Sequence, residues 1–104
     1  LIAYLLGKHR NMKKMNTNEI EAALKNLTGW ELKNDMIERS FTFKDFKEAF
    51  SMMTRIAFEC EKQQHHPNWE NVYNNLTVKL STHDANGVTQ KDIDLAKTIE
   101  DIVA

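Results

Sequence analysis

The chain has one cysteine, Cys60, one proline and three glycines among its 104 residues. A single cysteine cannot form an intrachain disulfide, and its simplest setting is a reducing compartment, which favours the cytoplasm. The glycines, Gly7, Gly29 and Gly87, are too far apart for a phosphate-binding loop or a dinucleotide fingerprint. Nucleotide-dependent chemistry is therefore disfavoured.

The chain also lacks an excess of charge and a long apolar run. Its 14 basic and 15 acidic side chains give a formal charge of −1, which provides no positive surface for nucleic acid. The apolar stretch Leu1 to Leu6 is far shorter than the ~20 residues that cross a bilayer, so no membrane segment is expected. We expect a single domain over residues 16–104, preceded by an N-terminal extension, 1–15, whose order the sequence leaves open.

Two apolar patterns with helical spacing begin at capping signals. Asn16, followed three residues later by a glutamate, predicts a first helix that runs to about Asn26. Thr42, followed three residues later by an aspartate, predicts a longer helix that extends to Gln63. The apolar stripe of this long helix comprises Phe43, Phe46, Phe50, Met53, Ala57 and Cys60. Because so long a helix exceeds what one small sheet covers, part of it is expected to contact another subunit.

Strand patterns occur in two pairs. Residues 30–33 and 36–41 flank Asn34-Asp35, and residues 69–73 and 76–80 flank Asn74-Asn75, so both pairs predict hairpins. Thr89, followed three residues later by Asp92, predicts the capped start of a last helix. The inward positions of this helix are Ile93, Ala96, Ile99 and Val103. The order helix, hairpin, helix, hairpin, helix predicts an α+β fold, with a four-stranded antiparallel sheet and three helices on one face.

Three histidines, His65, His66 and His83, flank the second predicted hairpin. Closing that hairpin should bring them together, since the ends of its two strands meet. Imidazole both accepts and donates protons near neutral pH, so the cluster suits general acid–base chemistry. Glu61 lies one helical turn before His65, and we expect its carboxylate to fix the tautomer of that ring.

Other interpretations of these residues stay open. A zinc site could use His65 or His66 with His83 and Glu61, although adjacent histidines point apart in an extended chain and no H-E-x-x-H spacing is present. The histidines could also be packing or surface residues, as we expect for His9. Trp69 and Tyr73 are expected to pack in the sheet, and secondarily to stack on a flat ring. Cys60 is expected to be a buried helix residue.

Several motifs together resemble the pterin-4a-carbinolamine dehydratase family. They are His65-His66-Pro67-Asn68-Trp69, the following Tyr73-Asn74, Ser81-Thr82-His83, and Gly87-Val88-Thr89 with Asp92. The motifs occur in order with the family's spacing, and the resemblance extends from about Ile20 to the end of the chain. It implies a dehydratase that removes water from 4a-hydroxytetrahydropterin, giving quinonoid dihydropterin in tetrahydrobiopterin recycling, with neither a metal nor an organic cofactor.

The resemblance also implies roles for individual residues. His65 and His83 match the acid–base histidines, and His66 matches one that serves both binding and catalysis. Glu61 matches a carboxylate that supports the first histidine. Four residues match positions at or close to the substrate pocket: Pro67, Trp69, Thr82 and Asp92.

The implied partners are the pterin substrate and further copies of the chain, in a homodimer or homotetramer. Vertebrate members of the family also serve as dimerisation cofactors of a homeodomain transcription factor. An interaction protein without catalytic activity is therefore one alternative, and a nuclear location would accompany it. A histidine-bound metal hydrolase is the other.

Overall fold

The structure is a computed structural model that describes residues 13–104. The predicted Leu1 to Leu6 stretch, most of the N-terminal extension and His9 lie outside the described residues. The main elements follow the predicted order: α2 (Thr17–Leu24), β1 (Glu31–Lys33), β2 (Met36–Thr42), α3 (Phe46–Gln63), β3 (Asn68–Val72), β4 (Asn75–Leu80), the short 3-10 helix η1 (His83–Ala85) and α4 (Gln90–Val103).

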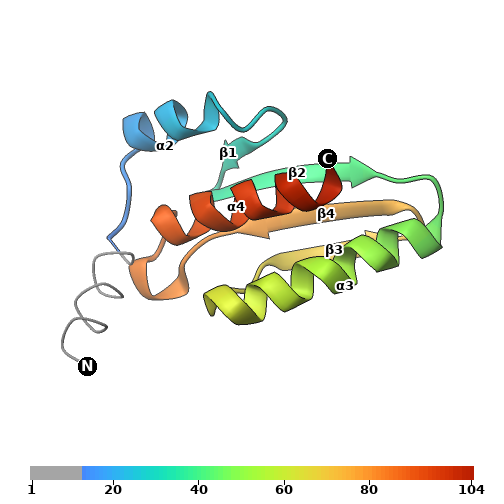
Figure 1. The fold of residues 1–104 in the computed structure, drawn as a ribbon. Coiled ribbons are helices and arrows are strands. Elements are labelled where there is room, and N and C mark those ends of the chain that lie inside the picture. Colours follow the sequence, from blue (N-terminus) through green and yellow to red (C-terminus); the bar gives the residue numbers. More distant parts are fainter. Residues whose placement is uncertain (1–12) are drawn as a thin grey trace.

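The four strands form one antiparallel sheet in the order β1-β2-β4-β3. Helices α3 and α4 lie side by side across one face of this sheet, and α2 lies beside the β1 edge (Figure 1). The opposite face carries polar pairs, among them Ser40 and Thr77, whose hydroxyls are 2.9 Å apart. The predicted α+β fold is therefore confirmed.

One predicted hairpin turn is confirmed and the other is displaced by one residue. Asn34 and Asp35 have φ values of 50° and 62°, which suit a two-residue hairpin turn. In the second hairpin Val72 pairs with Asn75, so the turn consists of Tyr73 and Asn74 rather than the predicted Asn74-Asn75. The Asn74 side chain donates to the Phe43 carbonyl (2.9 Å), and the Phe43 N–H donates to the Asn74 carbonyl (2.8 Å). These two bonds hold the turn in place.

The long helix begins later than predicted. Thr42 is the last residue of β2, where it pairs with Asn75. The N-cap is Asp45, whose side chain accepts a hydrogen bond from the Glu48 N–H at 2.9 Å. The predicted cap at Thr42 is therefore wrong, because pairing with β4 keeps the chain extended at this residue.

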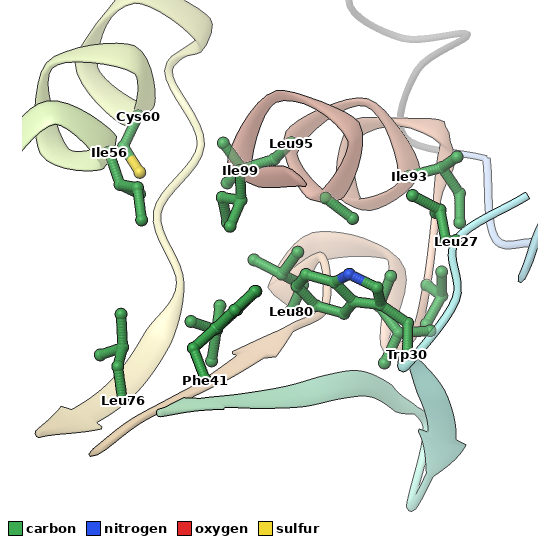
Figure 2. Close-up of a cluster of buried hydrophobic side chains, with 14 of the residues drawn as sticks. Leu27, Trp30, Phe41, Ile56, Cys60, Leu76, Leu80, Ile93, Leu95 and Ile99 are labelled. Carbon is green, nitrogen blue, oxygen red and sulfur yellow. The ribbon is translucent and has the colours of Figure 1, made fainter. Parts of the chain in front are cut away.

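The core lies between the sheet and the two long helices. Figure 2 shows Ile56 and Cys60 of α3 and Ile99 of α4 pointing towards the strands, and Leu95 of α4 on the side of its helix that faces α3. On α3 the fully buried residues are Ala49, Ile56 and Cys60. Phe46, Phe50 and Phe58 are 45%, 56% and 72% exposed. The predicted apolar stripe is therefore divided: Cys60 lies in the core, whereas Phe46 and Phe50 lie at the surface, on the helix that was expected to contact another subunit in part. The predicted inward face of α4 is confirmed at Ile93, Ala96 and Ile99.

A polar cluster joins α4 to β2 and to the segment just before β1. The Glu100 carboxylate accepts hydrogen bonds from Trp30 Nε1 (2.9 Å) and Arg39 (2.6 Å). Arg39 also donates to the Thr28 carbonyl and lies 4.5 Å from the centre of the Phe41 ring. These bonds satisfy the partly buried indole N–H and guanidinium beside the core.

The described part of the N-terminal extension contacts the domain. Met15 packs against the core, and its N–H donates to the Val88 carbonyl at 2.8 Å. In residues 13–104 no helix combines the length and apolar character that crossing a membrane would require.

Candidate active site

The carboxyl end of α3 determines where the two adjacent histidines lie. Gln64 has left-handed backbone angles, with φ 53° and ψ 45°. The His65 N–H donates to the Cys60 carbonyl (3.0 Å) and the Gln64 N–H to the Glu61 carbonyl (3.2 Å). This pair of bonds is the Schellman motif, which ends the helix and reverses the chain. His65 is thereby directed into the domain, and His66 stays exposed.

His65 forms a buried pair with Asp92. Its Nε2 lies 2.5 Å from Asp92 Oδ1. The imidazole side chain is 10% exposed and the carboxylate is fully buried. The pair joins the end of α3 to the first turn of α4, two segments that are far apart in the sequence. Glu61 was expected beside His65; that prediction is wrong, because the helix ends before His65 and turns the ring away from the exposed side of α3.

The second oxygen of Asp92 is bonded to residues on both sides of the η1 segment. Asp92 Oδ2 accepts from the Thr89 N–H and from the Thr82 hydroxyl, both at 2.9 Å. The hydroxyls of Thr82 and Thr89 lie 2.7 Å apart. Asp92, the third residue of α4, thus completes the capping box with Thr89 and is also a partner of His65. The sequence showed the capping box, but it did not show that Thr89 belongs to the site.

His66 has a separate carboxylate partner, Glu61. Their Nε2 and Oε2 atoms are 2.5 Å apart, and their side chains are 61% and 77% exposed. Water screens such a pair, so it adds little to stability. Its chemical importance is that an exposed imidazole, which a substrate can reach, has a carboxylate beside it.

His83 and the predicted pocket residues lie around these pairs. His83 is exposed at the start of η1, next to Thr82. Because Asp92 is bonded to both His65 and Thr82, it connects the segments that carry His65 and His83, two of the three catalytic histidine candidates. Thr82 and Asp92 were predicted to belong to the substrate pocket. Thr82 is 5% exposed and Asp92 0%, so neither has much free surface with which to contact a substrate.

Trp69 and Pro67 lie at the start of β3. Trp69 is partly buried and packs against the core. It also borders a hollow of about 120 Å³ whose other lining residues are Asn68, Glu70, Thr77 and Lys79. Pro67 is half-buried between His66 and this strand. Tyr73, the other aromatic that was considered for stacking, is 63% exposed in the hairpin turn.

Cys60 is close to His65 in sequence but belongs to the core. It is 2% exposed, as predicted. Burial raises the pKa of its thiol from 9.0 to about 11, and the neighbouring carboxylates of Glu61 and Glu59 add to the effect. Nucleophilic cysteines need a lowered pKa, so this thiol is unsuited to nucleophilic catalysis.

The arrangement supports proton transfer. A buried imidazole–carboxylate pair and an exposed one follow each other in the chain, so two histidines are oriented by two different carboxylates. Within the part of the chain that the structure describes, there is no group of three or more His, Cys, Asp or Glu side chains placed to hold a metal ion. General acid–base catalysis is what these residues are equipped to perform.

Comparison with known proteins gives consistent matches. The family model described as pterin 4 alpha carbinolamine dehydratase matches residues 13–102. A protein of Christiangramia forsetii named pterin-4-alpha-carbinolamine dehydratase is 59% identical over 92 residues, covering 88% of this chain and 95% of its own length. A Prochlorococcus marinus protein of the same name is 48% identical over 88 residues, covering 85% and 92%.

A solved structure matches as well. The crystal structure described as transcriptional coactivator/pterin dehydratase from Brucella melitensis superposes with a TM-score of 0.87. Its sequence is 41% identical, and the match covers 88% of this chain and all of that one.

Proposed function

Because the chain belongs to the pterin-4a-carbinolamine dehydratase family and is a dehydratase, we propose that it removes water from 4a-hydroxytetrahydropterin by histidine acid–base catalysis. The product is the quinonoid dihydropterin, and the reaction serves tetrahydrobiopterin recycling in the cytoplasm. The observation that carries the proposal is the pair of adjacent histidines, each next to its own carboxylate: His65 with Asp92 and His66 with Glu61.

The elimination requires two proton transfers. The bond between C4a and the hydroxyl oxygen breaks, and a proton delivered to that oxygen makes water the leaving group. The proton on N5 is lost to a base, and its electron pair forms the new C=N bond. Positioned histidines perform such steps near neutral pH, and each typically contributes about 10² to 10⁴ in rate.

The roles proposed for the histidines follow their surroundings. His66 is exposed beside Glu61, which supports its contact with the pterin as well as proton transfer. His65 and His83 are proposed to exchange the remaining protons. Trp69 and Pro67 are proposed to border the bound ring, since both lie within three residues of His66 and are only partly covered.

The test is the dehydration rate of freshly generated 4a-hydroxytetrahydropterin, followed by absorbance. Wild type should accelerate it, and His66→Ala should lower kcat/KM by more than the ~10²-fold attributed to one acid–base group, because the residue both binds and reacts. Lys97→Ala, which changes an exposed residue of α4, is the matched control and should retain wild-type activity. Near-normal turnover by His66→Ala would refute the role of His66.

A second role is supported by the exposed side of α3. Phe46 and Phe50 are about half exposed there, with their ring centres 5.8 Å apart, and large apolar side chains grouped on a surface commonly mark a contact with protein. We propose that this face joins copies of the chain into a dimer or tetramer. The Brucella protein is described as a transcriptional coactivator, so a transcription-factor partner is the alternative occupant. Folded protein that fails to accelerate dehydration would place the interaction role first.

A further inference from the structure

We infer that Asp92 is a positioning residue that holds the His65 ring with its proton on Nε2 and leaves Nδ1 to exchange protons with the substrate. The inference rests on the proposed function and assigns a new role within it. Asp92 itself is fully buried, so its influence on the reaction has to pass through another residue. His65, whose Nε2 lies 2.5 Å from Asp92 Oδ1, is that residue.

The donors around Asp92 Oδ2 determine what Oδ1 can do. Each threonine hydroxyl has a single proton. The Thr82 hydroxyl donates its proton to Oδ2, so the 2.7 Å contact between the two hydroxyls requires Thr89 to donate to Thr82. The Thr89 oxygen in turn accepts from the Lys91 N–H at 3.2 Å. Each hydrogen bond in this series is therefore donated in the direction of Asp92.

With the Thr89 N–H as a second donor to the same oxygen, Oδ2 accepts two hydrogen bonds. The carboxylate also lies in the first turn of α4, where the positive end of the helix dipole favours a negative charge. An ionised carboxylate accepts hydrogen bonds and donates none. His65 Nε2 therefore carries the hydrogen in the contact with Oδ1.

A neutral imidazole has one N–H and one lone pair, so fixing the hydrogen on Nε2 leaves the lone pair on Nδ1. Within residues 13–104 the structure shows no hydrogen-bond partner for Nδ1, and no fully buried side-chain nitrogen or oxygen there lacks one. These two findings indicate that solvent or substrate reaches Nδ1. His65 would then accept and donate its catalytic proton through Nδ1.

The substitution Asp92→Asn tests this assignment with a nearly isosteric side chain. If the amide oxygen takes the place of Oδ2, it retains the bonds from Thr82 and Thr89. The amide NH2 group then faces His65 Nε2, which must present a lone pair, so the ring proton moves to Nδ1. The opposite orientation would set the NH2 group against two donors, which would leave buried groups without acceptors.

Two readouts separate this role from a structural one. Ring nitrogen chemical shifts of His65, assigned by comparison with His65→Asn at a pH where the ring is neutral, should report hydrogen on Nε2 in wild type and on Nδ1 in Asp92→Asn. Steady-state kinetics of Asp92→Asn should show kcat lowered by about 10²-fold or more. KM should change by less than about threefold, because the residue does not touch the substrate.

Two further variants serve as controls. Asp94→Asn makes the same change at an exposed aspartate of the same helix, bonded to Gln90, and should alter neither readout. Thr82→Val removes one donor but keeps the carboxylate, so the proton should stay on Nε2 even if the variant is less stable.

The outcomes distinguish this inference from the proposed function. Hydrogen on Nδ1 in wild type, or an unchanged tautomer and kcat in Asp92→Asn, would overturn the inference. A rise in KM with kcat unchanged would instead make Asp92 a binding residue and also overturn it. The tautomer is measured without substrate, so inactive wild-type protein with hydrogen on Nε2 would refute the proposed function and leave the arrangement of Asp92 and His65 intact.

Discussion

At the scale of single residues, two neighbours in the chain have opposite surroundings. His65 is buried against Asp92, whereas His66 is exposed beside Glu61. Successive side chains of an extended segment point to opposite sides, and the turn at Gln64 places the domain on one side and solvent on the other. The two imidazoles therefore differ in access and mobility. Such a difference suits a reaction that needs one group to hold a fixed position and another to meet the substrate.

Cys60 is close to both histidines in sequence, but its thiol should react slowly with alkylating reagents. Because burial raises its pKa to about 11, the thiolate fraction at pH 8 is about 100-fold lower than for a thiol with the ordinary value of 9.0. Iodoacetamide at pH 8 should therefore modify native protein at least about 100-fold more slowly than protein unfolded in urea. Mass spectrometry of the alkylated chain measures both rates.

The same shift has a consequence for stability at high pH. The folded thiol binds its proton more tightly than the unfolded one, so its contribution to stability is complete below pH 9 and is lost as pH rises through about 11. Equal alkylation rates in the native and unfolded protein would contradict both statements.

At the scale of secondary-structure elements, α3 connects the sheet to the site. Its first turn comes a few residues after β2, and its last turn places His65. The N-cap at Asp45 and the Schellman motif at Gln64 satisfy backbone groups at both ends, groups that a helix cannot satisfy internally. Defined ends fix the helix along its axis, and with it the position of the histidines.

Two substitutions distinguish the observed start of α3 from the one predicted by pattern. Asp45→Ala removes the side chain that accepts from the Glu48 N–H and should lower the free energy of unfolding by about 1 kcal/mol. Thr42→Val removes the hydroxyl of the predicted cap but keeps a β-branched residue in β2, so it should change stability by less than about 0.5 kcal/mol. Urea denaturation of both variants beside wild type makes the comparison. A larger loss for Thr42→Val than for Asp45→Ala would restore the earlier start.

At the scale of the whole molecule, α3 faces two ways. One side of the helix completes the core with Ala49, Ile56 and Cys60, and its phenylalanines lie on the surface. The ring centres of Phe46 and Phe50 are 5.8 Å apart, so they form a continuous apolar area. A surface of this kind is expected to be covered by protein in the assembled state.

The proposed association can be tested by placing a charge on this surface. Burying one phenylalanine contributes about 1.5 to 3 kcal/mol, so Phe50→Glu should weaken association by at least about tenfold. Light scattering during size-exclusion chromatography should show a dimer or tetramer for wild type and a shift towards monomer for Phe50→Glu. Lys25→Glu, at an exposed position just after α2, is the control and should leave the assembly unchanged. A monomer for wild type at all concentrations would exclude the proposed association.

The sequence by itself determined what depends on neighbours along the chain. The capping boxes that begin with Asn16 and Thr89, the tight turn at Asn34-Asp35 and the alternation in β4 were all visible as local patterns and were confirmed. The order of these elements was enough to predict the α+β sheet, and the histidine motifs were enough to indicate the family.

Only the tertiary structure decided which groups meet and which faces are buried. Spacing alone paired Glu61 with His65, whereas the left-handed turn at Gln64 moves His65 away and Asp92, distant in sequence, takes that place. Spacing also grouped Phe46 and Phe50 with Cys60 in one apolar stripe, whereas in the structure Cys60 lies in the core and the two phenylalanines lie at the surface. In each case several partners fit the local pattern equally well. The choice between them depends on the packing of α4 and the sheet, which no short stretch of sequence contains.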